Sequence, residues 1–100
     1  MIKKGDKKSN RLETVPGIGK SLARDLRDLG IKDVENLRGR DPEKMYTDLN
    51  VRRGVRQDPC VLYVFRCAVY FAETDKPEPE LVKWWNWKDR QLRRIHPVVK

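Results

Sequence analysis

The sequence contains few of the residues on which catalytic and metal centres depend. It has one histidine, His96, and two cysteines, Cys60 and Cys67. These three side chains do not complete a structural zinc site, which needs four ligands. No nucleophile-elbow, Walker A or His-Glu-x-x-His pattern occurs either. We therefore expect a protein that is not an enzyme and holds no metal or cofactor, and we infer no small-molecule substrate.

The two cysteines also do not suit a disulfide bond. They stand seven residues apart in a segment expected to be helical, so about 10.5 Å separates their Cα atoms along the axis. A disulfide needs Cα atoms within about 7 Å of each other. We expect both cysteines to be small buried residues of a protein kept in a reducing compartment.

Long hydrophobic runs are missing as well. No apolar stretch approaches the roughly 18 residues of a membrane span, and the first residues lack the apolar core of a secretory signal. No segment shows the apolar and polar alternation of a half-buried strand. These absences predict a cytoplasmic protein with an all-α fold and no membrane partner.

Positive charge, in contrast, is plentiful. The chain has 23 Lys and Arg residues against 15 Asp and Glu, for a net charge of +8. The excess lies in residues 1–11, 50–58 and 84–100, whereas residues 12–49 are nearly balanced. Such a distribution favours a polyanionic partner.

The chain has 100 residues, 38% of them apolar, which is enough for one small domain. We predict a basic N-terminal arm in residues 1–9, a single helical domain in residues 10–96 and a short tail in residues 97–100. The arm has two interpretations, additional affinity for phosphate or improved solubility, and the sequence favours neither.

Capping residues and helix breakers divide the domain into five or six helices. Asn10, Asp41 and Asp58 stand where N-caps are expected, and Gly30 where a helix ends. The expected helices cover residues 10–14, 20–29, 33–37, 41–49, 60–72 and 81–95. The fifth is apolar almost all round, which indicates a buried central helix. Its one charge, Arg66, is expected to reach the surface or to pair with a carboxylate.

Three tryptophans open the last basic segment. Aromatic rings beside lysine and arginine suit base stacking in single-stranded nucleic acid. Helical spacing from Leu81 favours instead the packing of Trp84 and Trp85 on the central helix, with Trp87 exposed. The sequence does not decide whether this segment is functional or part of the core.

The most informative segment is residues 12–26, Leu-Glu-Thr-Val-Pro-Gly-Ile-Gly-Lys-Ser-Leu-Ala-Arg-Asp-Leu. It resembles the helix-hairpin-helix motif, whose pattern is apolar-x-x-apolar-Pro-Gly-apolar-Gly-x-x-x-Ala-x-x-Leu. All eight patterned positions are filled, by Leu12, Val15, Pro16, Gly17, Ile18, Gly19, Ala23 and Leu26. The resemblance implies two short helices joined by a glycine turn.

The residues of this turn predict an anion site. Gly17 allows a geometry that a Cβ atom would penalise, and Gly19 lets a ligand approach the backbone. The amides from Gly17 to Lys20 lack helical partners at the positive end of a helix dipole, which suits a backbone phosphate. Ile18 anchors the turn in the core. Lys20 and Arg24 extend the contact along one face of the second helix.

A second basic group lies in residues 50–57, which are expected to form a loop around Gly54. Its arginines are Arg52, Arg53 and Arg56. Contact of these side chains with phosphate and a merely solvated loop are equally consistent with the sequence. Arg27 continues the stripe of Lys20 and Arg24, and we assign it to an ordinary solvated face.

Three further blocks, residues 37–43, 58–71 and 84–89, extend the similarity beyond the motif. With them, residues 10–90 resemble the small bacterial helix-hairpin-helix proteins of the pathogenicity locus family, some of which carry a mitomycin-resistance label. The resemblance implies a compact, SAM-like bundle with a degenerate second unit in residues 42–72, whose loop lacks Pro-Gly-x-Gly. It implies no reaction.

These features lead to two main hypotheses. The first is sequence-independent binding of DNA through phosphate contacts at the helix-hairpin-helix, because backbone amides and lysine do not inspect base edges. The alternative is a protein–protein interaction module that uses the same fold as a scaffold. A small DNA-processing enzyme is a third hypothesis, which no catalytic pattern supports.

Overall fold

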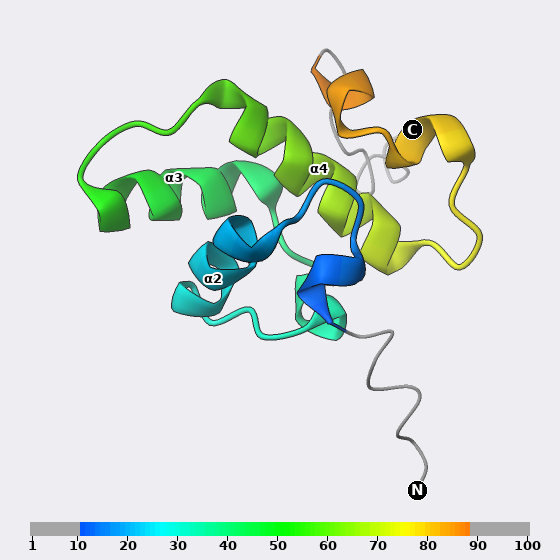
Figure 1. The fold of residues 1–100 in the computed structure, drawn as a ribbon, viewed down its shortest axis with the longest axis horizontal. Coiled ribbons are helices and arrows are strands. Elements are labelled where there is room, and N and C mark those ends of the chain that lie inside the picture. Colours follow the sequence, from blue (N-terminus) through cyan, green and yellow to red (C-terminus); the bar gives the residue numbers. More distant parts are fainter. Residues whose placement is uncertain (1–10, 89–100) are drawn as a thin grey trace, which may run out of the picture.

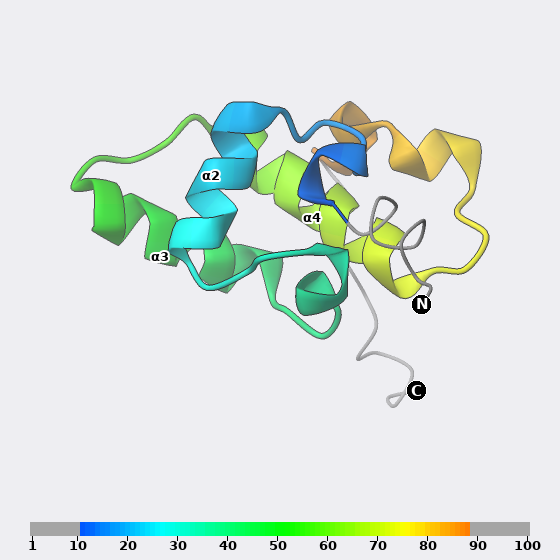
Figure 2. The same cartoon turned by 60° about the horizontal axis from the view of Figure 1, so that its bottom comes forward.

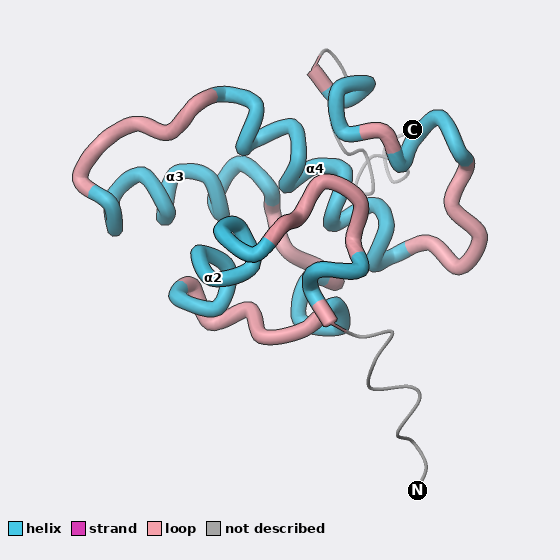
Figure 3. Tube along the Cα trace, viewed as in Figure 1, coloured by secondary structure: helices cyan, strands magenta, loops and turns pink. Residues whose placement is uncertain are grey.

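The computed structural model describes residues 11–88, and these form an all-helical fold in which no strand occurs. Its α-helices are α2 (Lys20–Asp28), α3 (Pro42–Arg53) and α4 (Pro59–Glu73). Four short 3-10 helices accompany them: η1 (Leu12–Thr14), η2 (Val34–Leu37), η3 (Pro79–Val82) and η4 (Trp84–Trp87). Figure 3 shows how loops separate these elements. The all-α class is thus confirmed.

The predicted number of helices is wrong, because the described range holds three α-helices instead of five or six. The segments expected at residues 10–14 and 33–37 form single 3-10 turns, since three or four residues are too few to propagate an α-helix. The helix expected from residue 81 is interrupted at Lys83, whose backbone is extended. The predicted arm and tail lie outside the described residues.

Helix α4 is the centre of the fold, as its apolar composition predicts. Seven of its residues are buried: Val64, Phe65, Arg66, Cys67, Ala68, Val69 and Ala72. Helix α3 and the 3-10 helices η2, η3 and η4 all pack against α4 (Figures 1 and 2). The first segment joins the same core through Leu12, Val15, Ile18, Ala23 and Leu26.

The two predicted Asp-Pro helix starts are confirmed. The Asp41 carboxylate accepts a hydrogen bond from the Glu43 amide at 3.0 Å, and the Asp58 carboxylate accepts one from the Cys60 amide at the same distance. In each case a proline follows at the first helical position, where its missing N–H costs nothing. Local capping chemistry therefore determines where α3 and α4 begin.

Helix α3 ends four residues later than expected. It continues through Arg53 and is closed by Gly54, which adopts a left-handed conformation at φ +73°. Asn50 lies within the helix. Its side chain accepts a hydrogen bond from the Gln57 amide at 2.7 Å and thereby fixes the loop that follows α3. The prediction that Arg52 and Arg53 lie in a loop is consequently wrong.

Helix α2 ends at Asp28, one residue before the predicted end, and Gly30 closes it in a left-handed conformation as predicted. Gly30 has φ +89°, and the Ile31 amide donates back to the Leu26 carbonyl at 2.9 Å. The Gly30 amide donates to the Arg27 carbonyl at 3.0 Å. This pairing satisfies carbonyls that the helix itself leaves free.

The tryptophan segment differs from the prediction. Trp87 is 2% exposed, and its indole N–H donates to the Leu81 carbonyl at 2.9 Å. Trp84 is partly buried against the core, whereas Trp85 is 56% exposed. Trp85 and Trp87 therefore exchange the places expected for them.

The cysteines are both free thiols, and they differ in burial. Cys67 is buried as expected, but Cys60 lies exposed in the first turn of α4. The prediction for Cys60 is wrong because the first turn of α4 is solvent-exposed, and burial along this helix begins only at Val64. Within residues 11–88, no helix has the length and apolarity needed to cross a membrane.

Candidate functional site

The turn between η1 and α2 is held firmly against the core. The Val15 amide donates to the Leu12 carbonyl at 3.0 Å, and the Ile18 amide donates to the Val15 carbonyl at 3.1 Å. The Ile18 side chain is buried, as predicted. The Ile18 amide is thus used within the turn, so the prediction that every amide from Gly17 to Lys20 is available to a phosphate is wrong for Ile18.

Gly17 is required in this turn for two separate reasons. Its φ of +90° lies in the region that side chains rarely adopt. A Cβ atom there would also lie 2.9 Å from Cδ1 of Trp84 and 3.4 Å from Cγ1 of Val64. The turn therefore packs directly on Trp84, which brings the tryptophan segment to the candidate site.

The start of helix α2 is open. Gly19 is its N-cap, with an extended backbone, and no side chain among residues 11–88 caps the helix. A Cβ atom at Gly19 would meet no heavy atom of the described structure within 4 Å. The amides of the first turn have no intrahelical acceptor, and the helix dipole makes this end positive. The arrangement offers backbone donors to an approaching anion.

Two exposed cations stand on the first turns of α2. Lys20 and Arg24 are both solvent-exposed, and neither forms an ion pair with any carboxylate in residues 11–88. Arg27, in contrast, lies 3.3 Å from the Glu13 carboxylate. Lys20 and Arg24 thus keep a free charge near the open end, while Arg27 is partly neutralised.

The arginines of α3 face the acidic residues of α2. Arg53 forms an ion pair with the buried carboxylate of Asp25, and Arg52 lies 3.9 Å from the carboxylate of Asp28. Both acids lie in the C-terminal half of α2, away from Gly19. The structure therefore brings Arg52 and Arg53 to α2 but does not join them to the open N-terminal end.

Arg56 is the third predicted arginine of this group. It is exposed in the loop after Gly54, and it pairs with no carboxylate among the described residues. Two exposed apolar side chains lie nearby in sequence, Val51 at 75% and Val55 at 61% exposure. The sequence does not single out these valines, because residues 50–57 are expected to form a loop.

Shifted pKa values occur away from this open helix end. Hydrogen bonds from the Cys60 amide and from its thiol lower the pKa of Asp58, and the same carboxylate raises the pKa of the Cys60 thiol. A backbone hydrogen bond, more than the nearby Arg27, lowers the pKa of Glu13. Within the described range, no group of three or more metal-ligating side chains gathers. The arrangement at Gly19 suits binding of an anion by fixed donors.

The chain is similar to proteins that are already known. Over 84 residues it is 34% identical to the "Mitomycin resistance protein McrB" of Streptomyces lavendulae. This alignment covers 84% of this chain and 76% of the relative. No solved structure matches the chain. The profile of the family described as Cdd1, pathogenicity locus, matches residues 5–93. The chain therefore belongs to the pathogenicity locus family.

Proposed function

We propose that this protein binds DNA without regard to sequence, by holding backbone phosphates at a helix-hairpin-helix formed by η1, the glycine turn and α2. The observation that carries the proposal is the uncapped start of α2 at Gly19, where a Cβ atom would meet only open space. Backbone amides at such a helix end bind phosphate oxygens well. Lys20 and Arg24 then contact the neighbouring phosphates.

The proposed contacts do not distinguish one base sequence from another. Amides, Lys20 and Arg24 address phosphate oxygens, which are the same at every base pair. We propose binding without catalysis, because the open helix end combines no nucleophile with a base. Ile18 contributes by anchoring the turn in the core.

We assign residues 42–72 to a degenerate second unit of a SAM-like bundle. Helices α3 and α4 supply its two arms, and the loop between them replaces the glycine turn. In this unit Arg56 is the free cation, whereas Arg52 and Arg53 are held by carboxylates of α2. Arg56 therefore adds phosphate contact by its side chain alone.

The proposal can be tested at Gly19 with two matched substitutions. Gly19→Asp and Gly19→Asn both enter open space at an ordinary φ of −97°, and both side chains cap the helix. Only the aspartate adds a negative charge where a phosphate would lie. Fluorescence anisotropy of labelled duplex and single-stranded DNA, titrated from about 50 to 300 mM salt, measures the affinity.

The wild type should bind with a salt dependence that corresponds to about three to five neutralised phosphates. We expect Gly19→Asp to weaken binding by about tenfold or more and Gly19→Asn to weaken it less, because charge repulsion adds to the loss of amide donors. Binding that ignores salt, or that Gly19→Asp leaves unchanged, would contradict the proposal.

The alternative function is a protein–protein interaction module. The exposed valines Val51 and Val55 favour it, since exposed apolar side chains at a helix end suit a protein partner. Absence of any DNA binding at low salt would support this alternative. A monomeric protein that binds DNA through Gly19 would make it unnecessary.

A further inference from the structure

An exposed tryptophan lies beside the proposed phosphate site. Trp85 belongs to η4 and is 56% exposed, although most large apolar side chains of this fold are covered. Its ring centroid is 5.6 Å from that of Trp84, and the two rings meet edge to face. Trp84 in turn packs under Gly17. Figures 1 and 2 both place η4 next to the turn that leads into α2.

The backbone that carries Trp85 is held in place on both sides. The buried Arg66 donates to the Trp87 carbonyl at 2.8 Å, and the Asn86 amide side chain donates to the Glu80 carbonyl at 2.7 Å. The Trp84 ring also contacts the Trp85 indole edge to face. An aromatic ring that is fixed before binding loses little conformational entropy when a ligand stacks on it.

The surroundings of Trp85 do not repel a polyanion. Glu80, which accepts hydrogen bonds from the Asn86 side chain of the same segment, pairs with Lys83 at 3.1 Å, so its charge is cancelled locally. Lys88 is exposed one residue beyond η4, and Lys20 is exposed at the start of α2. A nucleic-acid strand can therefore approach the ring from the side of the glycine turn.

We infer that Trp85 is a base-stacking residue and that the protein prefers single-stranded nucleic acid, or an unpaired end, to an intact duplex. The inference rests on the proposed phosphate site at Gly19. A strand held there passes close to Trp85, and an unpaired base next to the bound phosphate lies against the indole. Bases inside a duplex are already stacked and paired, so they cannot use this surface.

The test compares three nucleic acids and four proteins. The nucleic acids are an oligothymidylate, a single strand of equal length whose central residues are abasic, and a duplex. The proteins are the wild type, Trp85→Ala, Trp85→Phe and the control Val51→Ala, which truncates an exposed apolar side chain on α3. Anisotropy gives the affinities, and circular dichroism verifies that each variant is folded.

We expect Trp85→Ala to bind oligothymidylate about tenfold more weakly, because stacking on an aromatic ring is lost. Trp85→Phe should retain much of the affinity, and Val51→Ala should bind like the wild type. The abasic strand should bind the wild type as weakly as oligothymidylate binds Trp85→Ala. Affinity for the duplex should change little in any of these variants.

Two outcomes separate this inference from the phosphate site. If Gly19→Asp weakens binding but Trp85→Ala binds both single strands like the wild type, the stacking role is wrong and the phosphate site stands. If Trp85→Ala weakens binding to the abasic strand as much as to oligothymidylate, the residue acts through the fold or the backbone, and the inference is overturned. If no strand binds, both proposals fall.

Discussion

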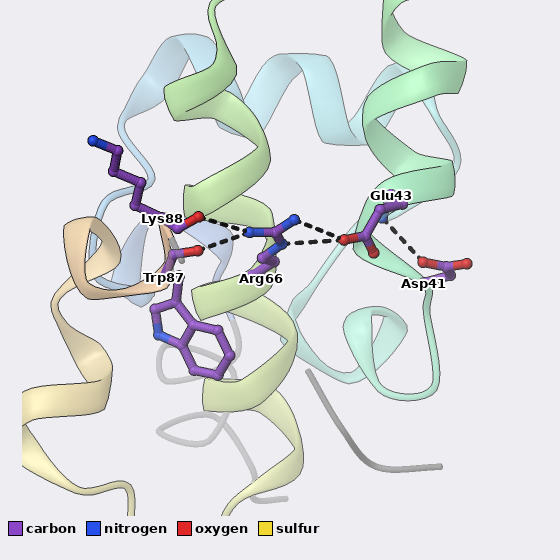
Figure 4. Close-up of polar contacts among 5 residues, drawn as sticks. All are labelled: Asp41, Glu43, Arg66, Trp87 and Lys88. Carbon is purple, nitrogen blue, oxygen red and sulfur yellow. Dashed lines mark hydrogen bonds and ion pairs between the residues drawn. The ribbon is translucent and has the colours of Figure 1, made fainter. Parts of the chain in front are cut away.

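The guanidinium of Arg66 joins α4 to Glu43 of α3 through two hydrogen bonds to one carboxylate oxygen, at 3.0 and 3.1 Å (Figure 4). On its other side the same guanidinium donates to the Trp87 carbonyl at 2.8 Å. The Arg66 side chain is 9% exposed, whereas that of Glu43 is 46% exposed. A single buried cation thereby holds the tryptophan segment and α3 against the central helix.

Replacing Arg66 should destabilise the fold. We expect Arg66→Met to lower the free energy of unfolding by about 2–3 kcal/mol, because the Trp87 carbonyl loses a buried donor and Glu43 loses its partner. Urea unfolding followed by circular dichroism measures the change. The control is Lys44→Met, which removes an exposed pair with Asp48 and should cost less than about 0.5 kcal/mol. Equal effects of the two substitutions would show that the bridge does not stabilise the fold.

Local signals explain why much of the fold can be predicted. The starts of α3 and α4 follow from Asp41 and Asp58, and the end of α2 follows from Gly30, because each cap involves residues close in sequence. The burial of α4 follows from its composition. These features need no knowledge of distant parts of the chain.

The tryptophan segment shows where sequence patterns fail. A period of 3.6 residues places Trp85 on the buried face with Trp84, but η4 is a 3-10 helix with three residues per turn. Residues three apart then share a face, so Trp84 and Trp87 turn inward and Trp85 turns outward. Trp87 is fixed in this position by the Arg66 guanidinium, which donates to its carbonyl, and by the Leu81 carbonyl, which accepts from its indole N–H. The spacing of apolar residues in the sequence does not reveal these contacts.

The candidate site also has one part that the sequence predicts and one part that it does not. The open helix start at Gly19 is encoded in one short motif, and it was predicted from that motif. The pairing of Arg53 with Asp25 joins residues 28 positions apart. It depends on how α3 packs beside α2, and no local pattern indicates it.

The packing of Trp84 under the glycine turn leads to a prediction at Gly17. Gly17→Ala should lower the free energy of unfolding by about 2–3 kcal/mol, because a left-handed alanine is strained and its Cβ atom meets Trp84. Gly30→Ala is a matched control with a similar φ but open space around the Cβ position, and should cost about 1 kcal/mol. Thermal and urea unfolding measure both. If the two variants are equally stable, the contact with Trp84 is easily relieved.

The two thiols should differ sharply in reactivity. Burial raises the pKa of Cys67 to about 11, so this thiol stays protonated and shielded in the folded protein. Cys60 is exposed, although Asp58 raises its pKa and slows its reaction. Ellman's reagent at pH 8 should therefore count one reactive thiol in the folded protein and two in urea. Cys60→Ser should abolish the reaction of the folded protein.

The raised pKa of Cys67 also affects stability at high pH. Between its ordinary value of 9.0 and about 11, the unfolded chain releases a proton that the folded chain retains. The folded state is therefore destabilised as pH rises through this window. Cys67→Ala should lose less of its unfolding free energy between pH 8 and pH 10 than the wild type does. An identical pH dependence in the two proteins would contradict the raised pKa.

The ion pairs of α2 separate the cations that we propose to contact phosphate from those that stabilise the fold. Arg53→Met should lower the free energy of unfolding by about 1–2 kcal/mol, because Asp25 is left buried without its partner. Lys20→Met removes a free, exposed charge and should change stability by less than about 0.5 kcal/mol.

The effects of the same two substitutions on DNA binding should be reversed. Lys20→Met should reduce the slope of log affinity against log salt by about one, and Arg53→Met should change it less. Anisotropy and urea unfolding on the same preparations give both quantities. A larger loss of slope in Arg53→Met than in Lys20→Met would move the phosphate contact from the start of α2 to the end of α3.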